Sequence, residues 1–124
     1  HNALFFRSLI ERLEDYIPAG RVSEIWIPFP DPLPKNRQAR HRLVSPQFLE
    51  HYGQLLCPLG TIHLKTDHEA VVDYAERAVR ARGGRVLDGA DLTADAEMST
   101  VRSTYEKRYR DEGRTIHARV FRLD

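Results

Sequence analysis

Strand-like and helix-like segments alternate along the chain, and this alternation constrains the fold more than any other feature. The helix-like segments repeat apolar residues every three or four positions, and the strand-like segments are short and rich in β-branched or aromatic residues. The predicted strands cover residues 3–6, 23–29, 61–65, 85–87 and 115–123, and the predicted helices begin near residues 9, 46, 67 and 101. This order favours an α/β fold with a mostly parallel sheet and helices on its faces.

Three helix starts carry capping signals. Ser45 precedes a proline, which is typical of an N-cap followed by the first helical residue. Ser8 and Glu11, and again Thr66 and Glu69, are spaced three apart as in a capping box. Residues 88–100 are polar and acidic and predict an irregular loop. The alternation around Trp26 places this side chain in the core.

Length and composition narrow the class of protein. With 124 residues the chain is long enough for one domain, residues 1–124, but not for two independent cores. It contains no apolar run near the ~18 residues that a membrane span needs. A single cysteine excludes an internal disulfide framework and fits a cytoplasmic protein. The formal net charge is +1, so any nucleic-acid binding must come from a local basic patch.

Two aspartates follow predicted strands, where ligands bind in open α/β sheets. Asp31 follows the strand at 23–29, and Asp67 follows the strand at 61–65. Asp31 could equally be a turn residue between prolines. For Asp67, the position favours the alternative of an acid that stabilises a helix start over a ligand-binding role. His63, Asp67 and His68 match no standard zinc spacing, so we expect no metal site.

A basic segment follows Asp31 directly. Its cations have no acid among them, and they comprise Lys35, Arg37, Arg40 and Arg42. Such a cluster can neutralise the phosphates of a nucleic acid without determining which sequence is bound. The alternative is a solvated basic loop without a partner. The rigid Pro-rich segment 30–34 before it and its place after a strand favour the binding role.

Three motifs resemble one family, the bacterial tRNA (guanine-N7-)-methyltransferases (the TrmB family). Residues 29–35, Phe-Pro-Asp-Pro-Leu-Pro-Lys, with Arg-His-Arg-Leu at 40–43, resemble the family signature FPDPWPK…KRRL. His-Leu-Lys-Thr-Asp at 63–67 resembles its strand end H-x-[KA]-T-D. Ser-Thr-Tyr-Glu at 103–106, followed by Gly113 and Ile116, is similar to its element T-x-[YF]-E…G…I. Leu33 departs from the usual tryptophan, and Ser103 from the usual threonine.

The resemblance implies a Rossmann-like class I methyltransferase fold that uses S-adenosylmethionine. It implies that Asp31 is the catalytic acid, with Asp31 and Ser8 near the cofactor. It implies that tRNA is bound by residues of all three motifs, namely Lys35, Asp67, Ser103, Tyr105 and Glu106. Arg37, Arg40 and Arg42 would hold the tRNA backbone, a role that their charge also supports.

The predicted function is transfer of a methyl group to guanine N7 in the variable loop of tRNA. The chain begins with His1 and contains no Gly-rich cofactor loop, so we expect the first strands of the fold to lie upstream. A sheet that lacks those strands would expose an edge and apolar surface, which favours self-association. The alternatives are a non-catalytic RNA-binding module and an inactive fragment. A Gly-rich strand-turn-helix upstream would favour the enzyme.

Overall fold

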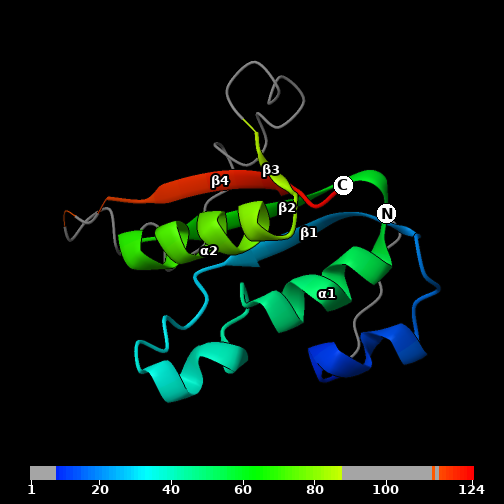
Figure 1. Ribbon diagram of the computed structural model, residues 1–124, viewed down its shortest axis with the longest axis horizontal. Helices are drawn as coiled ribbons and strands as arrows, with labels where there is room; N and C mark the ends of the chain where they lie inside the picture. The colour runs from blue at the N-terminus through cyan, green and yellow to red at the C-terminus, as the bar shows by residue number, and fades with distance from the viewer. Residues whose placement is uncertain (1–7, 88–112, 114) are drawn as a thin grey trace.

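The computed structural model describes residues 8–87, 113 and 115–124 of the chain (Figure 1). Within these residues, four strands form one sheet in the order β1-β2-β4-β3. The strands are β1 (Val22–Pro28), β2 (Leu56–Thr66), β3 (Arg85–Val86) and β4 (His117–Arg122). The helices are α1 (Pro46–Leu55), α2 (Glu69–Ala81) and the 3₁₀ helices η1 (Ile10–Asp15) and η2 (Asn36–His41).

Four of the predicted strands are confirmed, with shifted bounds. The largest shift is in β2, which begins at Leu56 directly after α1, although Pro58 and Gly60 suggested a break there. Leu59 takes a positive φ of 66°, and its N–H donates to the Asp124 carboxylate at 2.9 Å. The predicted strand at 3–6, the loop at 88–100 and the helix at 101–112 lie outside the described residues.

The described sheet is mixed, so the prediction of a mostly parallel sheet is wrong for these strands. β1 and β2 are parallel, with Ile27 paired to Leu64. β4 runs antiparallel to both β2 and β3. A period-two pattern identifies a strand but not its direction, because the side chains alternate in the same way whichever way the strand runs. The β1–α1–β2 unit nevertheless keeps the connection that a parallel pair requires.

One face of the sheet and both α-helices build the core. The fully buried Ile62 and Leu64 of β2 lie in register with Ile25 and Ile27 of β1. In Figure 1, α2 lies along β2 and β4, and α1 lies on the β1 side of the sheet. Trp26 lies on the opposite face, 39% exposed and stacked on His63 with ring centroids 4.8 Å apart. The prediction that Trp26 belongs to the core is therefore wrong.

Only one of the three predicted helix caps forms as expected. The Ser45 Oγ accepts the Phe48 N–H at 3.3 Å, and Pro46 is the first residue of α1. The first predicted helix is the 3₁₀ helix η1, and the Ser8 hydroxyl donates to the adjacent Leu9 carbonyl instead of capping it. Thr66 belongs to β2, and its Oγ1 accepts the N–H of His68, which is the N-cap of α2.

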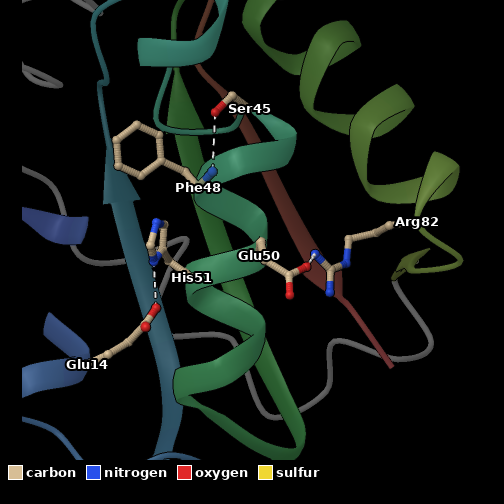
Figure 2. A network of polar contacts seen from close by, with 6 residues as sticks. All are labelled: Glu14, Ser45, Phe48, Glu50, His51 and Arg82. Carbon is tan, nitrogen blue, oxygen red and sulfur yellow. Dashed lines mark hydrogen bonds and ion pairs between the residues drawn. The ribbon is translucent and has the colours of Figure 1, made fainter. Parts of the chain in front are cut away.

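Polar contacts fasten α1 to its neighbours (Figure 2). His51 contacts the Glu14 carboxylate at the end of η1. Glu50 accepts from the Arg82 guanidinium, just beyond α2, at 3.2 Å. The Ser45 hydroxyl also donates to the Arg40 carbonyl at 3.2 Å. The first two contacts join α1 to η1 and to the end of α2, and Ser45 joins the Arg40 carbonyl at the end of η2 to the first turn of α1.

Replacing Ser45 with alanine is expected to lower the free energy of unfolding by about 1–2 kcal/mol. The serine is fully buried, so its loss leaves the Phe48 N–H and the Arg40 carbonyl without their partner. Urea unfolding of wild type and variant would measure the difference. Ser23→Ala, at an exposed position in β1, is the matched control and should change stability by less than about 0.5 kcal/mol. Equal stability of the two variants would contradict the capping role.

β1 is an outer strand of the described sheet, and an apolar groove runs along it. The groove is lined mainly by residues of η1 and β1, including Ile10, Leu13, Ile25 and Trp26. This agrees with the expectation of an exposed edge, and self-association stays a prediction. Among the described residues, no helix has the length and apolar character needed to cross a membrane.

Candidate functional site

A strained loop carries Asp31 at the carboxyl end of β1. Phe29 and Leu33 have φ values of 51° and 43°, which side chains other than glycine rarely adopt. The Phe29 N–H donates to the Lys65 carbonyl at 2.6 Å, so the loop leaves the sheet directly beside the end of β2. The prolines at 30, 32 and 34 restrict the backbone further. Backbone strain of this kind costs free energy and clusters at functional sites.

The Asp31 pocket lies where this loop meets η2 and the first half of α2. Its volume is about 210 Å³. The lining residues come from three segments: Pro30, Asp31, Pro32 and Pro34; Arg42, Leu43 and Val44; and Ala70, Val71, Tyr74 and Arg77. The walls are largely apolar and hold one carboxylate and two guanidinium groups. The pocket can therefore enclose a flat, partly apolar group and offer it both a hydrogen-bond acceptor and donors.

Arg42 connects the loop to α2. Its Nε donates to the Leu33 carbonyl at 2.9 Å, which holds one of the two strained residues of the loop. Its guanidinium carbon lies 4.6 Å from the centre of the Tyr74 ring, a cation–π contact. Nearby, the Tyr52 hydroxyl donates to the Leu43 carbonyl at 2.8 Å, and burial raises the pKa of this phenol. The base of the pocket is thus held from both helices.

The other basic residues of the predicted cluster lie on η2 or, for Lys35, at its N-cap, and they face solvent. Lys35, Arg37 and Arg40 are all exposed. The Lys35 N–H donates to Gln38 Oε1 at 3.3 Å, and Arg40 Nε donates to His41 Nε2 at 3.4 Å. Within the described part of the chain, no carboxylate forms an ion pair with any of these three side chains. Their charge is available to a phosphate backbone.

The remaining predicted site residues are not gathered in the Asp31 pocket. Asp67 follows β2 at the same edge of the sheet as Asp31, because β1 and β2 are parallel. Its side chain is only 8% exposed and lies 3.7 Å from His68 Nε2, and it does not line the pocket. Ser8 lies before η1 and does not line the pocket either. Ser103, Tyr105 and Glu106 lie outside the described residues.

Two pocket residues were missed by the sequence analysis, Tyr74 and Arg77 of α2. Their spacing of three residues puts them on the same side of a helix, which was the available signal. Among the described residues, no cluster of three or more His, Cys, Asp or Glu side chains could hold a metal ion.

Comparisons with known proteins agree with this geometry. A family model described as "Putative methyltransferase" matches residues 1–119. A tRNA (guanine-N(7)-)-methyltransferase of Bacteroides thetaiotaomicron is 38% identical over 98% of this chain and 49% of its own length. Proteins of the same name from Christiangramia forsetii and Clostridioides difficile are 33% and 32% identical, over 93% and 100% of this chain and 54% and 56% of their own lengths.

The chain spans about half the length of the curated relatives it matches. The matching relatives bear the family name that the three motifs indicated, so the resemblance is confirmed. The family model covers nearly the whole chain, and the loop with Asp31 and the basic helix η2 both lie inside the matched region. The chain therefore belongs to this methyltransferase family.

Proposed function

We propose that this chain forms the substrate side of a tRNA (guanine-N7-)-methyltransferase that acts on the variable loop of tRNA. The observation that carries the proposal is the Asp31 pocket at the carboxyl end of a parallel strand pair, next to an exposed helix of unpaired basic residues. The names of the relatives support the same activity. Because the proposed substrate is cellular tRNA, we also propose that the protein is cytoplasmic.

The pocket suits the chemistry of guanine N7. This nitrogen carries a lone pair in the plane of the ring, so it needs no base to become a nucleophile. Methyl transfer would form a bond between N7 and the methyl carbon while the bond between that carbon and the donor breaks. The donor's leaving group would keep the electron pair of the broken bond, and the ring would gain one positive charge without releasing a proton. The Asp31 carboxylate can accept hydrogen bonds from guanine N–H groups and stabilise the charge that develops. Correct alignment of N7 supplies much of the remaining rate enhancement.

A methyltransferase needs a methyl donor, and we propose S-adenosylmethionine. The described residues fit the base better than this donor. A pocket of about 210 Å³ is smaller than the roughly 300–1,000 Å³ typical of small-molecule sites. Ser8, predicted to lie near the donor, is not in the pocket, and no Gly-rich turn occurs in the sequence. We propose that Asp31 borders the donor, and the position of Ser8 near the donor stays a prediction.

For the fold, we propose a Rossmann-like class I methyltransferase domain, of which residues 1–124 form one part. The parallel pair β1 and β2, connected through α1, supports this proposal. The position of Asp31 beyond the carboxyl end of β1 is where such sheets bind ligands. An antiparallel strand such as β4 is common in otherwise parallel sheets.

The activity is tested by incubating the full-length gene product with unmodified tRNA and labelled S-adenosylmethionine. The expected product is 7-methylguanosine at one position of the variable loop, identified by nuclease digestion and mass spectrometry. Binding of tRNA without any methylated nucleoside would contradict the enzyme and favour the RNA-binding module instead. Absence of both binding and product would contradict both functions.

Charge reversal on η2 tests the tRNA contact. We expect Arg37→Glu combined with Arg40→Glu to weaken tRNA binding and to reduce the slope of log K against log salt by about 1.8, which is about 0.9 for each lost phosphate contact. Filter binding at several KCl concentrations would measure this slope. The control is Arg12→Glu with Arg21→Glu, two exposed arginines outside η2 with the same change in net charge. Equal slopes for the two double variants would contradict a specific role of η2.

A further inference from the structure

A second pocket adjoins the Asp31 pocket, between α2 and the segment that runs from η2 to the start of α1. Its volume is about 440 Å³, and we call it the α2 basic pocket. It is lined by Asn36, Arg42, Pro46, Tyr74, Arg77 and Ala78. Arg42, Tyr74 and Arg77 line both pockets and therefore form the ridge between them. None of the described residues that line the α2 basic pocket is acidic.

Both arginines of this ridge are held through their Nε atoms. Arg42 Nε donates to the Leu33 carbonyl at 2.9 Å, and Arg77 Nε donates to the Asp73 carbonyl at 3.3 Å. Among the described residues, no hydrogen bond or ion pair uses the Nη atoms of either side chain. Each guanidinium is therefore fixed at one end and retains its outer donors. Such pre-positioned arginines lose little conformational entropy when they bind an anion.

The Tyr74 ring contacts one of the two cations, and it lines both pockets together with the other. Arg42 stacks on this ring at 4.6 Å, and Arg77 follows Tyr74 by three residues on the same side of α2. α2 carries three carboxylates, and one of them, Glu76, pairs with Arg80 at 3.5 Å and with Arg119 at 3.0 Å. Among the described residues, no ion pair joins Glu69 or Asp73 to Arg42 or Arg77. The positive charge on the ridge is thus not neutralised by a described carboxylate, in contrast to Arg82, whose partner Glu50 appears in Figure 2.

We propose that Arg77 and Arg42 bind one phosphate of the RNA backbone, in the α2 basic pocket, next to the guanine held by the Asp31 pocket. The proposal rests on the tRNA methyltransferase function above and adds α2 to the RNA-binding surface. Guanidinium groups match phosphate oxygens in charge and in planar, two-pronged geometry. Because the same three side chains line both pockets, this phosphate belongs to a nucleotide beside the target guanosine.

The test compares Arg77→Ala with Arg80→Ala in the full-length gene product. Both replace an exposed arginine of α2, but only Arg77 lines the pocket. For Arg77→Ala we expect about a tenfold rise in the Kd and KM for tRNA. The salt slope of tRNA binding should fall by about 0.9, and Arg80→Ala should leave it unchanged. Arg77→Lys keeps the charge and should recover most of the salt slope.

Several outcomes would overturn the proposal. If wild type binds and methylates tRNA while Arg77→Ala and Arg80→Ala share one salt slope, the phosphate site is wrong and the proposed function stands. If wild type neither binds nor methylates tRNA, the proposed function itself fails. The third outcome comes from titrating the full-length gene product with inorganic phosphate at constant ionic strength while its melting temperature is measured. Thermal stabilisation by phosphate that is lost in Arg77→Ala, with an unchanged salt slope for tRNA, would assign the pocket to free phosphate instead of RNA.

Discussion

Methyl transfer to tRNA is expected to fall by about 10²- to 10³-fold in kcat when Asp31 is replaced by asparagine. Asparagine keeps the shape of the side chain but removes its negative charge. That charge matters most as the guanine ring becomes cationic, so the loss should appear in kcat more than in the KM for tRNA. Single-turnover assays with unmodified tRNA and the full-length gene product would measure the chemical step directly.

The structure supplies a control for this variant and a way to exclude misfolding. Asp15→Asn removes a carboxylate that is equally exposed but lies on η1, where it faces Arg12 at 3.7 Å. It should leave kcat within about twofold of wild type. Asp31 is itself exposed, so the melting temperature should change little in either variant. An Asp31→Asn protein with normal kcat would show that the carboxylate is only a turn residue between prolines.

Replacing Phe121 with alanine is expected to lower the free energy of unfolding by about 3–5 kcal/mol. Phe121 is 1% exposed and lies in β4 between Ile62 of β2 and Val86 of β3. Its ring belongs to the core that both α-helices share, so its removal leaves a cavity that three elements border. Urea unfolding followed by circular dichroism would give the difference in stability.

Leu9→Ala is the control for the core variant, because Leu9 is 67% exposed. It should change the free energy of unfolding by less than about 0.5 kcal/mol. A loss below about 1 kcal/mol in Phe121→Ala would contradict the packing of β4 against β2.

The elements with strong local signals were predictable. The strand at Val22–Pro28 has β-branched and aromatic residues and ends at prolines, and α1 has both its cap, Ser45, and an apolar stripe. The capping-box signals at Ser8 and Thr66 gave wrong predictions, because each hydroxyl group has another hydrogen-bond partner in the fold. A hydroxyl three residues before a glutamate specifies a cap only when the backbone there is free to start a helix.

The candidate site was partly predictable. The sequence placed Asp31 beyond the end of a strand, now β1. Because β2 runs parallel to β1, Asp67 at the end of β2 lies at the same edge of the sheet. Arg42 was predicted to contact RNA because of its charge, but its bond to Leu33 and its contact with Tyr74 depend on how η2 packs against α2. Arg77 lies 35 residues after Arg42, the other cationic residue that lines the pocket. No local sequence pattern relates two positions that far apart in the chain.

The sequence by itself determined the approximate positions of the described strands and of α1 and α2, and the family to which the chain belongs. These properties depend on residues close together in the chain, namely apolar period, prolines, caps and contiguous motifs. The tertiary structure alone decided the direction of β4, the exposed side of Trp26 and the meeting of Arg42, Tyr74 and Arg77 at one ridge. Each of these depends on which distant segments pack together, because burial and hydrogen bonding across the sheet, not local preference, select that arrangement.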